Sequence, residues 1–506
     1  MIVAMTPPAP SAQRRELGSL LRSVVKVLCV ADAPDYEQPW QSHGAQPSTG
    51  SGAIIETSRG LRILTNAHCV ANQVFVEVRR YGLSQKFEAE VEALGHECDL
   101  ALLRVPDERF FHGVTPIPIG DLPALSTRVS VCGYPIGGER LSLTEGIVSR
   151  IELVAYAQSN RELLAVQIDA AINEGNSGGP VFEGGKLVGV AFQALEDADS
   201  VGYMIAPEVV RHFLEDIADG RYDGFPDVGV TTQPLESRAH RRALGLPAGC
   251  EDGVLIKRVA YGSSAWGALL PGDVLMSVDG VPVAPDGAVV LREGELIHFQ
   301  YVVSQRHVGE RMPVTVWRGG VVHSLELELA PPRPLVAEDR YDVRPSFYVY
   351  GGVLFVPLTR DFLKTWGDAW WQAAPRELVA LYESGMVTED RREVVVIQKV
   401  LADRINQGYH EFDNHVVVSV DGQPVRSLRH LVKLVEERPR ETFVRFRTSD
   451  GAVVVLDRQE VVARHRDLLV KFGVPRDRSE DLEPKVLPAN PGLIRANDEL
   501  ESRASA

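Results

Sequence analysis

Three residues in the first half of the chain have the types, and the order, that nucleophilic hydrolysis requires. His68 follows a strand-like run, Asp99 precedes another, and Ser177 lies in a stretch that reads Gly-Asn-Ser-Gly-Gly-Pro. A serine hydroxyl is a weak nucleophile until a base takes its proton, and His68 is the candidate base. Asp99 can hold the other ring nitrogen of His68, which fixes the tautomer. The sequence therefore predicts a His-Asp-Ser triad.

The glycines around Ser177 predict a second chemical feature, an oxyanion hole. They allow the backbone to present the N–H groups of Gly175 and Ser177 toward one point. Such donors stabilise the negative oxygen of a tetrahedral intermediate, and losing one typically lowers the rate by about 10²–10³. Gly178 and Gly179 permit close approach of the neighbouring chain. We therefore expect Gly175 and Ser177 to be the oxyanion donors.

The elements that must position these residues are short strands. From Leu20 to about Val230, β-branched runs alternate with Gly, Pro, Asn and Asp, which is typical of an all-β barrel or sandwich. The spacing of the three candidate residues suits two successive six-stranded barrels that meet at a cleft. A helical pattern over Ala206–Ile217 is expected to close the region. The expected strands are Val24–Val30, Gly52–Glu56, Arg62–Thr65, Val74–Val78, Leu100–Val105, Val129–Gly133, Gly146–Ile151, Leu164–Ile168 and Leu187–Phe192.

The second half of the chain contains a diverged repeat. A strand at Gly253–Val259, a short helix at Ser263–Leu270 and a strand that ends in an Asp279-Gly280 turn form the first copy. Strands at Val394–Val400 and Val416–Val420, with an Asp421-Gly422 turn, form the second. From first strand to turn the copies span 279 − 254 = 25 and 421 − 394 = 27 residues, which indicates two versions of one module.

Composition excludes several classes of protein. At roughly 150 residues per domain, 506 residues predict about three domains. The net charge of −16 argues against a nucleic-acid partner. Five cysteines without a C-x-x-C pair make a disulfide scaffold or a zinc ribbon improbable. We expect no metal and no cofactor. Neither a secretory signal nor a membrane-spanning run is visible, so the sequence predicts a soluble cytoplasmic or otherwise intracellular protein.

The motifs carry a resemblance to a known family. The strings TNAHCV, DLALL and GNSGGP resemble those of the HtrA/Deg serine proteases, and GDLPAL, GYPIGG and GFP are similar to the plant-type Deg branch. The resemblance implies a mainly β protein with a chymotrypsin-like double β-barrel followed by two PDZ domains. The implied parts are a flexible N-terminus (1–18), a trypsin-like serine protease domain (19–225), a first PDZ domain (226–332), a divergent second PDZ domain (333–474) and a tail (475–506).

The same resemblance implies roles for further residues. The walls of the pocket for the residue before the cleaved bond are expected at Ile172, Val190, Ala191 and Phe192, and these apolar walls predict a preference for small or medium aliphatic side chains. The first PDZ domain is expected to capture C-terminal peptides with its loop Asp252, Gly253, Val254 and Leu255. The second copy has no glycine in that loop, so peptide capture there is doubtful. Trimers or trimer-based hexamers are implied, with Tyr36 and Trp40 as candidate contacts.

Two local features depart from the family pattern or invite a second interpretation. Glu174 stands where family members often have proline, in the loop that must form the oxyanion hole. Loop ordering around Glu174 and Gln193–Ser200 would then regulate activity. Cys69 and Cys98 flank the triad, so a redox pair is conceivable, although two unlinked buried thiols are the favoured interpretation.

These observations predict an ATP-independent serine endopeptidase that degrades misfolded or unfolded proteins in quality control and is regulated through its PDZ domains. The chain contains no Gly-x-x-x-x-Gly-Lys-Ser/Thr loop that would power unfolding. Two alternatives stay open at this point. One is a binding or holdase protein that uses the protease fold as a scaffold, and the other is a processing peptidase with a single client.

Overall fold

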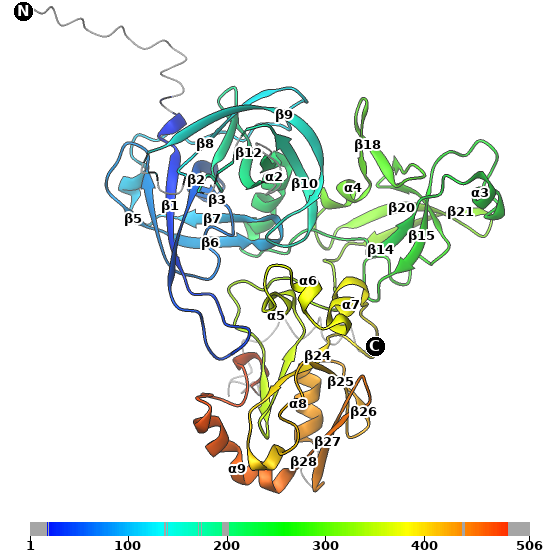
Figure 1. Cartoon of the computed structure of the whole chain (residues 1–506). Coiled ribbons are helices and arrows are strands. Elements are labelled where there is room, and N and C mark those ends of the chain that lie inside the picture. Colours follow the sequence, from blue (N-terminus) through cyan, green and yellow to red (C-terminus); the bar gives the residue numbers. More distant parts are fainter. Residues whose placement is uncertain are drawn as a thin grey trace, which may run out of the picture. The chain divides into compact units, whose positions relative to one another are not determined.

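The computed structural model of the chain describes residue 18 and residues 20–135, 138, 140–170, 172–173, 175–194, 202–437 and 441–483. Two compact units make up the chain (Figure 1). The first consists of Met1–Val343 and Leu358–Glu393, and the second of Arg344–Pro357 and Val394–Ala506. The expected fold class, mainly β, is confirmed. The second unit is therefore built from two separate stretches of sequence.

The first unit begins with a seven-stranded antiparallel sheet that carries His68 and Asp99. Its spatial order is β5-β4-β1-β2-β3-β7-β6. Alternate residues of its strands serve two cores, because side chains point to opposite faces with a period of two. Ile54 and Ile63 lie in the core of the sheet itself, whereas Ile55 and Leu64 join the core shared with the next barrel. The strands are β1 (Val24–Ala31), β2 (Gln46–Thr57), β3 (Gly60–Thr65), β4 (Gln73–Arg80), β5 (Phe87–Glu88), β6 (Glu90–Gly95) and β7 (Leu100–Arg104).

A closed six-stranded barrel follows and carries Ser177. Its order is β10-β13-β12-β11-β8-β9. Helix α2 (Pro207–Asp216) follows the barrel, as the helical pattern predicted, and buries Val209, Val210 and Phe213. The shared core holds the two sheets together, which fixes the side on which their loops meet. The strands are β8 (Arg128–Gly133), β9 (Ser142–Ala155), β10 (Glu162–Ile168), β11 (Pro180–Glu183), β12 (Lys186–Ala194) and β13 (Gly202–Ile205).

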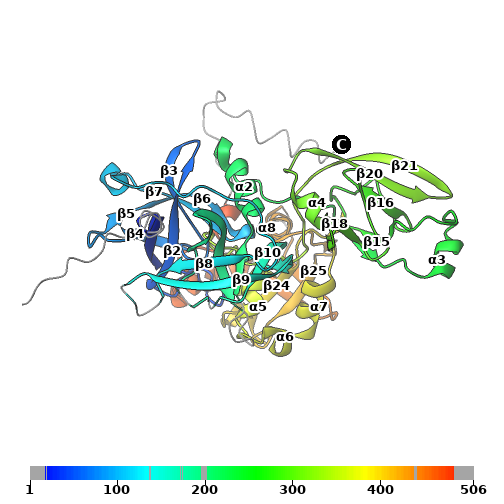
Figure 2. The same cartoon turned by 90° about the horizontal axis from the view of Figure 1, so that it is seen from above.

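A third sheet of the first unit corresponds to the first repeat. Its order is β14-β15-β16-β20-β21, and the hairpin β18-β19 stands beside it. Helices α3 (Arg238–Ala243) and α4 (Gln300–Ser304) lie at opposite ends of this module in both views (Figures 1 and 2). The helix predicted at Ser263–Leu270 is wrong, because that stretch forms consecutive turns before Pro271. The strands are β14 (Val230–Gln233), β15 (Val254–Val259), β16 (Val274–Val278), β17 (Val281–Pro282), β18 (Ala288–Arg292), β19 (Glu295–His298), β20 (Arg311–Arg318) and β21 (Val321–Glu328).

The remainder of the first unit is a linker and a helical insertion that the sequence did not reveal. The insertion holds α5 (Arg360–Lys364), α6 (Trp370–Ala373) and α7 (Arg376–Ser384). It lies inside the range expected for the second PDZ domain, yet it packs as part of the first unit. The Thr359 hydroxyl caps α5 by accepting from the N–H of Phe362.

The second unit is a sheet of the same type as the first repeat. Its strands are β22 (Tyr348–Tyr350), β23 (Val353–Pro357), β24 (Val395–Val400), β25 (His415–Val420), β26 (Gln423–Pro424), β27 (Phe443–Thr448) and β28 (Val453–Asp457), with α8 (Leu428–Glu436) and α9 (Arg458–Lys471). Both repeats contain the predicted Asp-Gly hairpin, β16-β17 and β25-β26. Asp279 and Asp421 adopt positive φ values of 51° and 48° there. The described residues contain no helix with the length and hydropathy needed to cross a bilayer.

Candidate active site

Asp99 occupies a left-handed backbone position that turns its carboxylate inward. It follows a short 3₁₀ turn, His96–Cys98, and has a φ of 52°. Asx residues tolerate this region better than most side chains. The Asp99 carbonyl oxygen accepts from Ala67 N at 3.1 Å and from Asn66 Nδ2 at 2.8 Å. The turn that carries Asp99 is thus bonded directly to the segment that carries His68.

The carboxylate of Asp99 holds His68 through two atoms. Oδ1 accepts from the backbone N–H of His68 at 2.9 Å, and Oδ2 lies 2.7 Å from ring Nδ1. The Asp99 side chain is 2% exposed and the His68 side chain 34%. Burial of the ring would lower its pKa, but the Asp99 carboxylate outweighs that effect and raises the pKa of His68 well above its ordinary value. The pair has the form of an oriented general base whose Nε2 is free to face a hydroxyl.

The Ser177 loop is shaped by its glycines. Gly175 has a φ of 92° and Gly178 a φ of 80°. A Cβ on Gly178 would overlap Ser51 O and Thr65 Oγ1. Of the described residues, none accepts a hydrogen bond from the amides of Gly175 or Ser177. The amides of Gly175 and Ser177 stay the predicted oxyanion donors.

Sequence reasoning missed Ser51, which ties the nucleophile loop to both sheets. Its hydroxyl donates to Gly175 O at 2.7 Å and accepts from Tyr134 N at 2.8 Å. Its backbone N–H donates to Ser177 O at 2.8 Å. Ser51 lies in a Gly-Ser-Gly run that resembles an ordinary tight strand, so no signal in the sequence distinguishes it.

The structure brings His68 and Asp99 together, but among the described residues no hydrogen bond joins the Ser177 hydroxyl to His68. The Ser177 hydroxyl instead donates to Phe192 O at 3.5 Å. Catalytic hydrogen bonds often tighten only when substrate binds. Glu174 and most of Gln193–Ser200, which carry the expectation of loop regulation, lie outside the described residues.

The residues expected to line the pocket are apolar and largely buried. Val190 and Ala191 are fully buried, Phe192 is 5% exposed, and Ile172 packs against the same core. Gly202 leaves room for Ile172, because a Cβ there would lie 2.6 Å from its Cδ1. The segment has the apolar character that the prediction needs, and the preference for aliphatic substrates stays a prediction.

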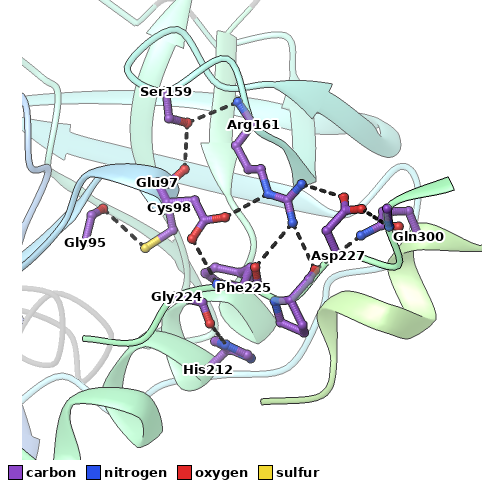
Figure 3. Close-up of polar contacts among 12 residues, drawn as sticks. Gly95, Glu97, Cys98, Ser159, Arg161, His212, Gly224, Phe225, Asp227 and Gln300 are labelled. Carbon is purple, nitrogen blue, oxygen red and sulfur yellow. Dashed lines mark hydrogen bonds and ion pairs between the residues drawn. The ribbon is translucent and has the colours of Figure 1, made fainter. Parts of the chain in front are cut away.

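A partly buried ionic cluster includes Glu97, in the turn that precedes Asp99 (Figure 3). Arg161 donates to Glu97 Oε1 at 2.7 Å and pairs with Asp227 Oδ2 at 2.8 Å. Burial raises the pKa of Glu97, although Arg161 and the N–H of Phe225 partly offset this. For Arg161, burial would lower the pKa, but the two carboxylates raise it. The cluster joins the turn before Asp99 to the chain that leads into the first repeat.

The cysteines are five free thiols. Burial raises the pKa of Cys29 to about 11 and that of Cys132 to about 12, and it raises the pKa of Cys98 further. The Cys69 Sγ lies 3.6 Å from Ser177 O, whereas the Cys98 Sγ contacts Gly95 O and the Tyr222 hydroxyl. Each of these two thiols thus has its own surroundings, in keeping with the interpretation as unlinked buried thiols.

The expected carboxylate loop of the first repeat leads into strand β15. Val254 and Leu255 lie in β15, whereas Asp252 and Gly253 precede it. Leu255 pairs with β14 on one side and with β16 on the other. The N–H of Gly253 donates to Val283 O at 2.6 Å. The two edges of this sheet are β14 and β21, and peptide capture at the loop stays a prediction.

Comparison with known proteins identifies the family of the chain. Residues 50–190 match the model of the trypsin-like peptidase domain, and residues 336–481 match that of the PDZ domain. The chain is 39% identical over 467 residues to "Putative protease Do-like 3, mitochondrial" of Arabidopsis thaliana, covering 92% of this chain and 81% of that protein. It is 38% identical over 475 residues to "Protease Do-like 2, chloroplastic" of the same plant, covering 93% and 77%.

A solved structure described as "HtrA-type protease AlgW with decapeptide" aligns with a TM-score of 0.48 and 22% identity, over 64% of this chain and 100% of that chain. The likeness to the Do-like proteases extends well beyond the peptidase segment, since it covers nearly the whole sequence. The expected chymotrypsin-like region with a PDZ domain is confirmed by the two domain matches. The chain belongs to the HtrA/Do-like family of serine proteases and is a serine endopeptidase.

Proposed function

We propose that this protease is ATP-independent and degrades misfolded or unfolded proteins in quality control. His68 is the base, Asp99 orients it, Ser177 is the nucleophile, and the amides of Gly175 and Ser177 bind the oxyanion. The observation that carries the proposal is the double attachment of His68 to the buried Asp99 carboxylate. No cofactor enters the reaction, because acyl transfer needs only a nucleophile, a base and oxyanion donors.

The decisive experiment compares the wild type with Ser177→Ala on casein and on a chemically unfolded protein. The wild type should degrade both substrates without ATP, and Ser177→Ala should degrade neither. Added ATP should leave the rate unchanged. Equal degradation by the two proteins would refute Ser177 as the nucleophile. A requirement for ATP would refute the proposal that the protease is ATP-independent.

The same variant separates quality control from the narrower function of a processing peptidase. Ser177→Ala should trap many unrelated polypeptides in a proteome-wide capture, since an unfolded chain is recognised by its extended backbone. A single trapped client would favour the processing function. A holdase would suppress aggregation of unfolded protein without producing fragments, and this outcome would replace the protease proposal.

C-terminal peptides are proposed to bind the first repeat, where β14 is an edge of the sheet beside the loop Asp252–Leu255. An extended peptide can add to an edge strand through backbone hydrogen bonds. Titration of a labelled C-terminal peptide should give saturable binding that its amidated form loses. Binding that is equal for both forms would exclude carboxylate recognition.

A trimer, or a hexamer of two trimers, is proposed from the family resemblance. Tyr36 and Trp40 are the candidate contacts, and the Tyr36 hydroxyl also donates to Arg340 O at 3.4 Å in the same chain. Native mass spectrometry should show multiples of three, and Trp40→Ala should shift them toward monomer.

An intracellular location is proposed as well, in keeping with relatives named as mitochondrial and chloroplastic. Cell fractionation tests it.

A further inference from the structure

A linker segment contacts residues that lie three or four positions from His68 and Asp99 in the sequence. We call Leu335–Val343 the strap. Asn72 and Asp342 both adopt left-handed conformations, with φ of 53° and 58°. Each donates its backbone N–H to the side-chain oxygen of the other, at 2.7 and 2.8 Å. Asn72 lies four residues after His68, so this reciprocal pair docks the strap beside the base.

A second contact places the strap beside Asp99. Asp342 Oδ2 lies 2.6 Å from His96 Nε2, and the ring of Tyr341 stacks on His96 with centroids 4.6 Å apart. The Gln158 amide nitrogen, 3.2 Å from His96 Nδ1, can only donate there. The Asp342 carboxylate thus faces His96 and the Asn72 amide at this end of the first sheet.

The strap also reaches the barrel that carries the nucleophile. The Tyr341 hydroxyl donates to Gln158 O at 2.9 Å. Gln158 lies in the turn between β9 and β10, whereas Asn72 and His96 belong to the first sheet. The strap therefore spans from one sheet to the other at one end of the region where their catalytic residues meet.

A polypeptide in the active site would run toward this end. β11 pairs with β12 as far as Val190, and Ala191 exchanges backbone hydrogen bonds with Gly178 and Gly179. Past Ala191, β12 has no backbone partner on that side among the described residues. An extended substrate can add to such an edge beside Ser177. The ring of Phe192 on this edge lies 4.6 Å from that of Tyr156. Tyr156 is the residue that follows β9, at the start of the turn that holds Gln158 under the strap.

We propose that Tyr341 and Asp342 form the distal wall of the substrate groove and select the residues that precede the cleaved bond. We expect the affected side chains at roughly the second to fourth positions before the bond, because the strap contacts the turn after β9 and not Ser177 itself. The Asp342 carboxylate disfavours acidic side chains there, while the Tyr341–His96 stack accepts uncharged ones. This inference rests on the proposed role of Ser177 and adds the substrate preference of the same site.

The test measures kcat/KM for peptide pairs that differ only by Glu or Gln at the second, third or fourth position before the bond. The wild type should prefer Gln by roughly fivefold to tenfold at one position at least. Asp342→Asn should bring that ratio close to one. The matched control Asp121→Asn removes a carboxylate of the same region that is 90% exposed and paired with Arg211, and should keep the wild-type ratio. An unchanged ratio in Asp342→Asn overturns the proposal, as does an equal effect in peptides varied after the bond.

A second measurement needs no variant. Raising the salt concentration from about 0.05 to 0.5 M should reduce the wild-type preference for Gln, because the Debye length shortens severalfold. A preference that does not change with salt excludes Asp342 as its source. Labelling of Ser177 by a fluorophosphonate probe distinguishes a failure of the proposed function from a failure of the proposed groove wall. Absence of labelling and of cleavage refutes the proposed function, whereas labelling with equal Glu and Gln rates refutes the wall alone.

Discussion

Asp99 fixes both the backbone and the ring of His68 with a single buried carboxylate. One oxygen accepts the His68 amide at 2.9 Å and the other lies 2.7 Å from Nδ1. Two attachments define the plane and the tautomer of the ring together, and they leave Nε2 as the acceptor. The strength of His68 as a base therefore depends on Asp99 more than on any other contact.

Asp99→Asn should lower kcat by about 10⁴, as loss of the orienting carboxylate does in Ser-His-Asp enzymes. An amide has one accepting oxygen, so its NH₂ group must face either the His68 amide or Nδ1, and the wrong tautomer results. Single-turnover hydrolysis measures the loss. Asp107→Asn, at an exposed turn, serves as control. A loss below tenfold with an unchanged melting temperature would show that Asp99 does not orient the base.

The pH profile of kcat/KM should rise with an apparent pKa above 6.5. The raised pKa of His68 means that the ring stays protonated to higher pH, and a protonated ring cannot accept the Ser177 proton. Activity is therefore lost as the pH falls through the pKa of His68 in the folded protein. Asp99→Asn removes the charge that raises this pKa, so its residual activity should rise at lower pH. A midpoint below 6.5 in the wild type would contradict the electrostatic argument.

The sequence predicted most of the local structure around the site because the site stands at strand ends. The run before His68 became β3 and the run after Asp99 became β7, each within about two residues of the expectation. The hairpins at Asp279 and Asp421 were predictable as well, since Asp-Gly favours the required positive φ.

What the sequence could not predict are contacts between distant segments. Ser51 and Gly175 are 124 residues apart, and Asn72 and Asp342 are 270 apart. Neither pair has a local signature. The pairing of Leu255 with strands on both sides was not predictable either, since an inner strand resembles an edge strand in sequence. The helical insertion Leu358–Glu393 was not predicted, because its helices are too short to show a clear helical period of apolar residues.

Arg161→Met should lower the free energy of unfolding by about 1–3 kcal/mol, because it removes the charged partner of Glu97 and leaves that carboxylate with the Phe225 N–H and the Tyr222 hydroxyl. The side chains of Arg161 and Glu97 are 15% and 20% exposed. The control Arg128→Met removes an arginine that is 80% exposed and 3.8 Å from Glu145, and should change stability by less than about 0.5 kcal/mol. Urea unfolding measures both. Adding Glu97→Gln to Arg161→Met should recover part of the loss, and equal stability of the two single variants would contradict the role of the cluster.

Iodoacetamide at pH 8 should modify Cys250 before the other four thiols. Cys250 is half-buried, whereas the others are buried, and burial raises the pKa of Cys29, Cys98 and Cys132. A thiol reacts through its thiolate, so these groups should react only after unfolding. Peptide mass spectrometry reads the order. Detection of a Cys69–Cys98 disulfide in oxidised protein would overturn the interpretation as unlinked thiols.

Gly178→Ala and Gly82→Ala form a matched pair, because both glycines have a φ of 80°. A Cβ at Gly82 meets no atom within 4 Å, whereas at Gly178 it overlaps Ser51 O and Thr65 Oγ1. Gly82→Ala should therefore lower stability by about 1–2 kcal/mol, the usual effect of a left-handed alanine, and leave kcat intact. Gly178→Ala should lower stability further and abolish labelling of Ser177, because the shifted loop moves the nucleophile and the oxyanion donors together. Equal effects of the two substitutions on unfolding and on labelling would show that close packing around Gly178 does not shape the nucleophile loop.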